Sequence, residues 1–282
     1  MLSYRHGFHA GNFADVMKHA GLLALVARLL EKPRPITLMD SHAGPGLYDL
    51  SHAFAEKTGE WRDGVGRLLA LPDLPEAWHA YRDAVAADMA AGGAPSYPGS
   101  PELMRRCLRP DDRLILCELH NTDAPELKRL MRGDGRVQVH LRDGFEAMGA
   151  LLPPEPRAGA LLIDPPYEVK TDYIRLPEAV AGVARRWAEG AILIWYPILP
   201  DARHAGMVMA LEGVHPKGWL RWELLDQRPK QGRAGLAGSG LILLNPPWRL
   251  AESWDALSQS LPQILFDGAG ESRLTASLGE TP

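Results

Sequence analysis

The sequence predicts an α/β fold built on a seven-stranded, mostly parallel sheet with a helical insertion after the first strand. Three observations support this prediction. Seven short apolar runs lie along the 282 residues, and most are separated by segments long enough for a helix. Most of the runs are continuous rather than alternating, as expected for strands that are buried on both faces. The interval between the first two runs far exceeds a simple crossover connection, which needs about a dozen residues.

The first predicted element is a helix over residues 14–30, whose apolar side chains recur at helical spacing. Asp15, Lys18 and His19 lie on a neighbouring polar face, which is either solvated or part of a site. The last two apolar runs lie close together in the sequence and suit an antiparallel edge pair. The Gly- and Ser-rich tail from Phe266 onward is expected to fray. The predicted strands cover residues 36–39, 113–117, 137–141, 158–163, 191–195, 220–225 and 241–244.

The long interval after the first strand predicts an insertion. Residues 50–97 contain Trp61, Trp78, Tyr81 and an alanine-rich stretch, which together indicate a small helical subdomain. Residues 1–49 and 98–282 would then form the main domain, and the N-terminal segment would join its site.

Composition limits the classes of function. The 31 basic and 35 acidic side chains give a net charge of −4, so any surface that attracts nucleic acid must be local. Cys107 and Cys117 are too few for a disulfide scaffold and lack the spacing of a metal site. The longest apolar runs fall short of the roughly 20 residues that span a bilayer. We therefore expect a cytoplasmic protein without a membrane partner.

Motifs after the first three strands favour a nucleoside-like ligand. Residues 40–46, Asp-Ser-His-Ala-Gly-Pro-Gly, allow the backbone to approach a ligand closely. The dinucleotide fingerprint is not satisfied, because Asp49 occupies the place of its third glycine. Glu118 follows the second strand and suits ribose hydroxyls, whereas Asp143 and Gly144 follow the third and suit an adenine ring with its amine. Taken singly, Glu118 and Asp143 are equally compatible with ordinary helix caps.

The fourth strand ends in Asp164-Pro-Pro-Tyr167, which suits methylation of an exocyclic amine. The N6 of adenine is a weak nucleophile, because its lone pair is delocalised into the ring. The Asp164 carboxylate would accept one N–H, the Pro165 carbonyl would accept the other, and Tyr167 would stack on the base. In isolation this motif could be only a turn. A rival, Asn245-Pro-Pro-Trp248, follows the last predicted strand.

The order of these four motifs decides between the alternatives. The carboxyl ends of parallel strands line one edge of a sheet, where ligands bind. This order is typical of class I (Rossmann-like) S-adenosylmethionine-dependent methyltransferases, and it favours Asp164 over Asn245, whose strand lies away from the switch point. Methyl transfer from a sulfonium is an in-line displacement that needs no metal. We therefore predict no metal site at the four histidines His6, His9, His19 and His42.

The chain also resembles the RlmJ family of 23S ribosomal RNA adenine-N6 methyltransferases. The resemblance is carried by residues 1–19, Met-Leu-Ser-Tyr-Arg-His-Gly-Phe-His-Ala-Gly-Asn-Phe-Ala-Asp-Val-Met-Lys-His, by Tyr97-Pro-Gly-Ser-Pro101 and by Asp164-Pro-Pro-Tyr-Glu-Val-Lys-Thr-Asp-Tyr173. It implies that Tyr4, His6 and Lys18 lie beside the target adenine and that Asp164 is catalytic. The donor contacts that it implies are His19, His42, Ser100, Glu118, Asp143, Gly144 and Asp164.

The resemblance implies 23S ribosomal RNA as the partner, free or in an early assembly particle, for a protein that acts as a monomer. Three alternatives remain at this point: a DNA adenine-N6 methyltransferase, a protein-glutamine methyltransferase and a non-catalytic RNA-binding module. The glutamine enzymes usually carry Asn-Pro-Pro-Tyr, so Asp164 argues against them. Phosphates could bind three basic clusters, each of which could equally be a solvated face: Arg105, Arg106 and Arg109; Lys128, Arg129 and Arg132; Arg228, Lys230 and Arg233.

Overall fold

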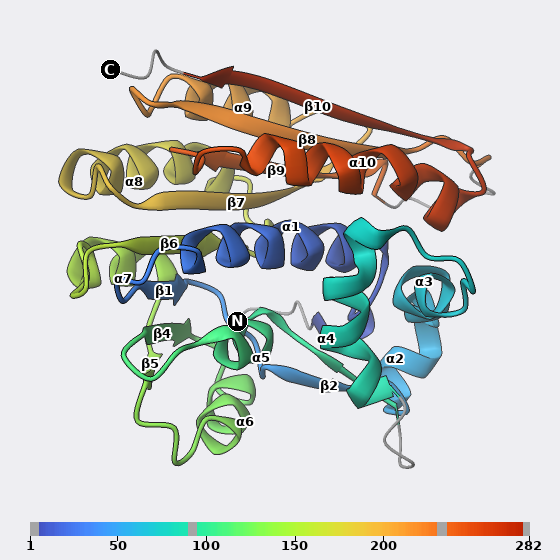
Figure 1. Ribbon diagram of the computed structural model, residues 1–282, viewed down its shortest axis with the longest axis horizontal. Coiled ribbons are helices and arrows are strands. Elements are labelled where there is room, and N and C mark those ends of the chain that lie inside the picture. Colours follow the sequence, from blue (N-terminus) through green and yellow to red (C-terminus); the bar gives the residue numbers. More distant parts are fainter. Residues whose placement is uncertain (1–5, 90–94, 230–235, 279–282) are drawn as a thin grey trace.

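An eight-stranded sheet forms the centre of the protein, and its strand order is β10-β8-β9-β7-β6-β1-β4-β5. The computed structural model describes residues 6–89, 95–229 and 236–278 (Figure 1). The strands of this sheet are β1 (Thr37–Asp40), β4 (Arg113–Glu118), β5 (Val137–Leu141), β6 (Gly159–Ile163), β7 (Ala191–Ile198), β8 (Gly218–Asp226), β9 (Gly238–Leu244) and β10 (Gly270–Leu278).

Helices cover both faces of the sheet. On one face α1 and α10 lie next to each other and follow the strand direction (Figure 1), and α7, α8 and α9 pack on the opposite face. The α-helices are α1 (Phe13–Leu30), α2 (Ala53–Thr58), α3 (Arg67–Leu69), α4 (His79–Met89), α5 (Ser100–Cys107), α6 (Asp123–Leu130), α7 (Gly144–Leu151), α8 (Asp172–Arg186), α9 (His204–Glu212) and α10 (Leu250–Phe266). Shorter helical turns occupy η1 (His6–Phe8), η2 (Arg62–Gly66) and η3 (Glu76–Trp78).

Strand β6 shows why the apolar runs are continuous. Ala160 and Leu162 contribute to the hydrophobic cluster under α1 and α10, whereas Leu161 and Ile163 contribute to the cluster under α8 and α9. All five residues of the strand are buried. Successive side chains of a strand point to opposite faces. A strand with helices on both faces therefore needs apolar residues at every position.

All seven predicted strands are present, but the sheet contains an eighth. β10 pairs antiparallel with the whole of β8, within the tail that was expected to fray. The predicted antiparallel pairing of the last two predicted strands is confirmed, because β8 and β9 pair antiparallel. Their predicted edge position is wrong, because β10 lies outside β8 and forms the edge of the sheet. The four residues from Thr275 to Leu278 are all exposed, so neither face of this end of the edge strand is covered. Such a strand carries many polar residues, so its composition resembles that of a loop.

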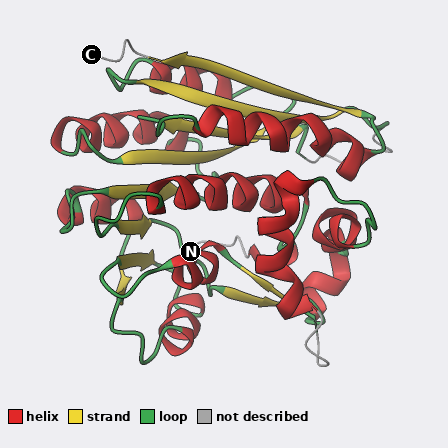
Figure 2. Ribbon diagram, viewed as in Figure 1, coloured by secondary structure: helices red, strands yellow, loops and turns green. Residues whose placement is uncertain are grey.

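The segment between the first two predicted strands is helical in its described part, as expected (Figure 2). A small antiparallel ladder of β2 (Leu47–Asp49) and β3 (Ser96–Pro98) joins its two ends. Trp78, Tyr81 and Val85 from this segment belong to the same hydrophobic cluster as the buried face of α1. The division into a main domain of residues 1–49 and 98–282 and a subdomain of residues 50–97 stays a prediction.

Helix α1 is placed by a strong N-cap. The Asn12 side chain accepts hydrogen bonds from the backbone N–H groups of Ala14 and Asp15, which satisfies two donors at the helix start. Strand β1 lies between β4 and β6, so the chain leaves it on one side and later returns on the other. Crevices form at the carboxyl ends of strands around such a reversal. This position brings the first turns of α1 to the functional edge of the sheet.

Candidate active site

A cleft of about 1530 Å³ opens at the carboxyl ends of β1, β4, β5, β6 and β7. Every predicted donor-contact residue lines it: His19, His42, Ser100, Glu118, Asp143, Gly144 and Asp164. Pro165, Tyr167 and Lys18 line it as well. The structure therefore brings together residues that come from six separate stretches of the sequence.

The loop after β1 is tied to the end of β4 by Glu118. Its carboxylate accepts hydrogen bonds from the backbone N–H of Gly44 at 2.7 Å and from that of His120 at 2.7 Å. Burial raises the pKa of this carboxyl group. Gly44 has φ +64°, and a Cβ at this position would lie 2.5 Å from the Tyr48 hydroxyl oxygen. The first glycine turn is thus required by the packing of the protein itself.

Asp143 and Gly144 follow strand β5 and line that side of the cleft. Asp143 is an N-cap, because its Oδ1 accepts from the backbone N–H groups of Phe145 at 2.9 Å and Glu146 at 3.1 Å. A Cβ on Gly144 would lie only 2.2 Å from the carbonyl oxygen of Ser41. Glycine therefore lets α7 begin directly against the loop after β1. Helix capping uses Oδ1 and is compatible with an adenine contact through Oδ2, which stays a prediction.

Asp40 positions two of the predicted donor contacts, Ser100 and His42, although the sequence alone did not indicate this role. It is fully buried and accepts hydrogen bonds from the Ser100 hydroxyl at 2.7 Å and the backbone N–H of His42 at 3.0 Å. Burial raises the pKa of Asp40 to about 7. His42 lies 2.8 Å from the Ser41 hydroxyl through its Nδ1, and burial lowers its pKa to about 4. The imidazole is therefore neutral at physiological pH.

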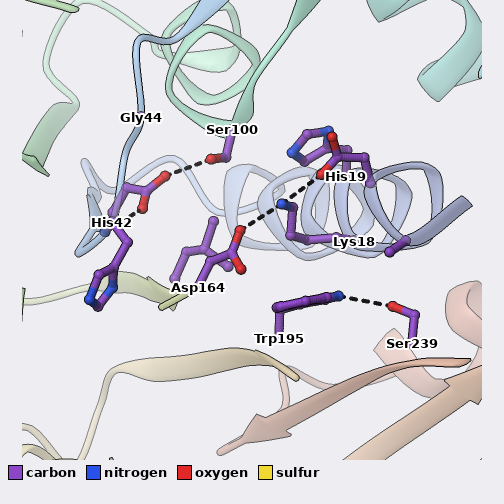
Figure 3. A network of polar contacts seen from close by, with 12 residues as sticks. Lys18, His19, His42, Gly44, Ser100, Asp164, Trp195 and Ser239 are labelled. Carbon is purple, nitrogen blue, oxygen red and sulfur yellow. Dashed lines mark hydrogen bonds and ion pairs between the residues drawn. The ribbon is translucent and has the colours of Figure 1, made fainter. Parts of the chain in front are cut away.

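Three charges from α1 and the end of β6 form a buried network (Figure 3). The Lys18 ammonium lies 2.6 Å from Asp164 Oδ2 and 2.8 Å from Asp15 Oδ1. Asp15 also accepts a hydrogen bond from the backbone N–H of Gly11 at 2.9 Å. Burial alone would lower the pKa of Lys18, but the two carboxylates outweigh it and raise that pKa above its usual value. The polar face of α1 is thus part of the site and not a solvated surface.

The aromatic wall of the cleft is formed by Tyr167 with Tyr173 and Trp195. Tyr167 has a positive φ of 53° and is 6% exposed, and its hydroxyl donates to the Trp195 carbonyl at 2.7 Å. Its ring centroid lies 4.9 Å from that of Tyr173 and 5.9 Å from that of Trp195. Trp195 is itself held by a hydrogen bond from its Nε1 to Ser239 (Figure 3). A planar ring that enters the cleft would therefore meet aromatic surfaces that are positioned by hydrogen bonds and ring contacts.

The rival motif lies at the opposite edge of the sheet. Strand β9 is antiparallel to β7, so Asn245 follows β9 at the end where β7 begins. The Asn245 amide donates to the carbonyl of Gly190 at 3.1 Å, and Trp248 is 79% exposed. Asn245 holds a tight turn at positive φ and does not line the cleft.

Comparison with known proteins identifies the family. A family model described as ribosomal RNA large subunit methyltransferase D, RlmJ, matches residues 33–276. The chain belongs to the RlmJ family. Two relatives named ribosomal RNA large subunit methyltransferase J are similar to it: that of Escherichia coli is 42% identical over 98% of both chains, and that of Haemophilus influenzae is 40% identical over 96% of both.

A solved structure supports the fold of this RlmJ family member. The crystal structure of protein LPL1258 from Legionella pneumophila has 31% sequence identity to the chain and a TM-score of 0.85. The match covers 97% of this chain and 99% of that one. The family resemblance and the predicted α/β methyltransferase fold are therefore confirmed, apart from the additional strand.

Some of the contacts that the RlmJ resemblance implies involve residues near the N-terminus. Tyr4 lies outside the described residues, and His6 is described only as backbone in η1. His9 pairs with Glu60 at 3.0 Å, whereas His19 shares a hydrogen bond of 2.6 Å with the Tyr97 hydroxyl. The described part of the chain contains no group of three or more His, Cys, Asp or Glu side chains that could hold a metal. None of its described helices is long and apolar enough to cross a membrane.

Two of the basic clusters are engaged in ion pairs within the protein. Arg105 and Arg106 both bind Glu102, and Arg109 binds Asp112. Arg228 binds Asp226 through its Nε, and its guanidinium lies over the Phe266 ring. These contacts favour a structural role for the first cluster. In the third cluster, Arg228 lines the cleft, whereas Lys230 and Arg233 lie outside the described residues.

Asp15, Asp40 and Trp195 are the site residues that sequence reasoning missed. From the sequence alone, Asp40 is only the first residue of the glycine loop, and Asp15 is only one residue of a polar helix face. A signal for Asp15 was present, because a carboxylate three residues before a lysine shares its helix face. Trp195 ends an apolar run without a polar motif, so the sequence offered no signal for it.

Proposed function

We propose that the protein methylates the exocyclic N6 of an adenine in 23S ribosomal RNA, with S-adenosylmethionine as the methyl donor. The observation that carries this proposal is the position of Asp164. It lies at the carboxyl end of β6 in the same cleft as Glu118 and Asp143, and its carboxylate is fixed by Lys18. A carboxylate suited to an amine and a pocket suited to a nucleoside would thus share one cavity.

The residues of the cleft fit the donor chemically. S-adenosylmethionine carries a sulfonium and an ammonium, and carboxylates in the cleft would attract both charges. Glu118 would hold the ribose hydroxyls, and Asp143 with Gly144 would hold the adenine of the donor. Ser100 and His42, both positioned by Asp40, complete the wall, together with His19. When bound, the donor supplies an electrophilic methyl group on sulfur.

Asp164 would orient the target amine. Lys18 already occupies its Oδ2, so its Oδ1 would accept one N6–H while the Pro165 carbonyl accepts the other. As the amine gains a methyl group it acquires positive charge, which the Asp164 carboxylate stabilises before the proton is lost. Tyr167 would stack on the base, and Lys18 would lie beside it. The adenine must be unpaired or flipped out to enter the cleft.

The choice of RNA rests on the relatives, both of which are named as ribosomal RNA large subunit methyltransferases. A DNA adenine methyltransferase would use the same chemistry, so substrate trials must separate the two. A protein-glutamine methyltransferase and a non-catalytic RNA-binding module receive no support from these relatives. We also infer that the protein acts as a monomer in the cytoplasm, on free 23S ribosomal RNA or on an early assembly particle.

The test is methylation of ribosomal RNA from a strain that lacks the gene, with a donor labelled in its methyl group. Wild type should label large-subunit RNA at one adenine, found by mapping the modified base, and should leave duplex DNA unlabelled. Asp164→Ala should bind the same RNA without labelling it. Labelling of DNA in place of RNA, or equal labelling by Asp164→Ala, would refute the proposal.

A further inference from the structure

A smaller hollow of about 270 Å³ adjoins the main cleft. It is lined by Lys170, Tyr173, Asp201 and Arg203. Tyr173, Asp201 and Arg203 also line the main cleft, so the two cavities share a wall. Lys170 belongs to the loop between the Asp164-Pro-Pro-Tyr167 motif and α8. The hollow is therefore built on the segment that carries the reacting group.

Tyr173 is one of the four residues that line this hollow, and its hydroxyl is a buried hydrogen-bond donor. Its residue is 8% exposed, and its hydroxyl has no hydrogen-bond partner among the described residues. Burial raises its pKa, so the hydroxyl remains protonated at neutral pH. Buried polar groups are normally hydrogen-bonded, and a buried hydroxyl without a partner is unfavourable. A ligand that reaches this buried oxygen and accepts its hydrogen bond would remove this cost.

The charged side chains that line the hollow favour an anion, although the Asp172 carboxylate also acts on Tyr173. Lys170 is exposed, and Arg203 is held by Asp201 through its Nε at 2.8 Å and through a terminal nitrogen. With one carboxylate and two cations, the hollow keeps one unit of positive charge. An arginine that is fixed in this way loses less conformational freedom when it contacts a phosphate. Lysine and arginine together with a hydroxyl donor are common partners of RNA phosphates.

We propose that Lys170, Tyr173 and Arg203 form a subsite for one backbone phosphate of the RNA, adjacent to the flipped adenosine. The inference rests on the proposed function and extends it from the base to the backbone. The Tyr173 ring lies 4.9 Å from that of Tyr167, which would stack on the target base. The hollow would therefore lie next to a phosphate of the same or the next nucleotide, and this phosphate is the anion that we assign to it. It would fix the register of the strand, while the cleft recognises the base.

Two variants test the subsite with little risk to the fold. Tyr173→Phe removes only the hydroxyl and keeps the ring against Tyr167, and Lys170→Ala removes an exposed charge. The matched control is Lys32→Ala, which removes an exposed lysine before β1, at the opposite edge of the sheet. Dissociation constants are measured between about 50 and 200 mM salt on a hairpin of large-subunit ribosomal RNA that contains the mapped adenine. Donor affinity and Tm are measured in parallel.

Lys170→Ala should weaken RNA binding and lower the slope of log affinity against log salt by about 1. Tyr173→Phe should weaken binding roughly fivefold to tenfold without lowering Tm. Lys32→Ala should match wild type, and donor affinity should be the same for all four proteins. A hairpin with a neutral methylphosphonate at one backbone position should lose affinity for wild type but not for Lys170→Ala.

Binding of both variants at wild-type affinity and salt slope would overturn the subsite, as would wild-type protein that does not bind the hairpin. Adenosine monophosphate distinguishes the source of the phosphate: if it competes equally well against wild type and Lys170→Ala, a free nucleotide phosphate does not use the hollow. Competition that is lost in Lys170→Ala, without any effect of the methylphosphonates, would overturn the assignment to the RNA backbone. If wild type binds the hairpin but methylates no RNA, the proposed function fails while these binding results still decide the subsite.

Discussion

Replacing Asp15 by asparagine should slow methyl transfer, although Lys18 lies between Asp15 and Asp164. The two carboxylates hold the ammonium from two sides, at 2.8 Å and 2.6 Å, and Asp15 is only 2% exposed. Asp15→Asn keeps the size of the side chain but removes its charge. The full charge of Lys18 then faces Asp164, so the carboxylate stabilises the positive charge that develops on the amine less well. The variant tests whether Asp15 tunes the site through this network.

The magnitude follows from Coulomb's law. The two contacts place Asp15 roughly 8 Å from an amine bound to Asp164, where a full charge contributes ~2 kcal/mol at an effective dielectric constant of about 20. If about half a unit charge develops on N6 in the transition state, the loss is ~1 kcal/mol, or roughly a sixfold fall in kcat. The KM for the donor should change less, because Asp15 acts on charge that appears during transfer.

The assay is initial-rate methylation of RNA at saturating donor and RNA, together with thermal unfolding of each protein. The control is Asp73→Asn, which makes the same change at an exposed residue of the insertion and should leave kcat unaltered. A kcat within twofold of wild type for Asp15→Asn, in a protein with wild-type Tm, would refute the electrostatic reasoning. A complete loss comparable to that of Asp164→Ala would refute it as well, because the expected effect is partial.

Three further predictions follow from the same contacts. Asp164→Ala should abolish transfer while the protein stays folded, whereas Asn245→Ala should keep activity; single-turnover rates and circular dichroism check both. Asp40 has a pKa of about 7 in the folded protein, above the value of about 4 in an unfolded chain, so its carboxyl group stabilises the fold at low pH and loses that contribution as pH rises toward 7. Between about pH 4 and pH 7.5, the unfolding free energy of wild type should therefore fall by up to ~4 kcal/mol more than that of Asp40→Asn. The same pH dependence of the unfolding free energy in both proteins would contradict this. Replacing the three basic residues that follow β8 by alanine should weaken RNA binding and reduce its salt dependence. An unchanged slope of log affinity against log salt would place the RNA-binding surface elsewhere. These three residues are Arg228, Lys230 and Arg233.

The sequence predicted the fold well where apolar content alone defines a strand. Strands β1, β4, β6 and β7 are buried on both faces, so each appears as an apolar run, whereas the edge strand β5 is only half-buried and alternates apolar and polar residues. The prediction failed for β10, whose exposed face is polar. It also placed the pair of β8 and β9 at the edge of the sheet, a position that β10 occupies, because the order of strands in a sheet depends on pairing between distant segments, which local composition does not encode.

The candidate site was predictable in its motifs but not in its contacts. Glu118, Asp143 and Asp164 were selected because each follows a strand, and parallel strands end at one edge. Their hydrogen-bond partners come from other segments and leave no local pattern. The Arg105 cluster illustrates the reverse error, since a run of basic residues gave no indication that Glu102 and Asp88 neutralise it.

By itself, the sequence determined the α/β class, the order of the motifs along one sheet edge and the family to which the chain belongs, because strand burial and motif spacing are local properties. Only the tertiary structure decided that Lys18 is a buried cation between two carboxylates and that Asp40 holds Ser100. Lys18 and Asp164 are 146 positions apart, and Asp40 and Ser100 are 60 apart. Such pairs meet only when the fold brings α1 and the ends of the sheet strands together. Their burial then determines which of these groups carry a charge in the site.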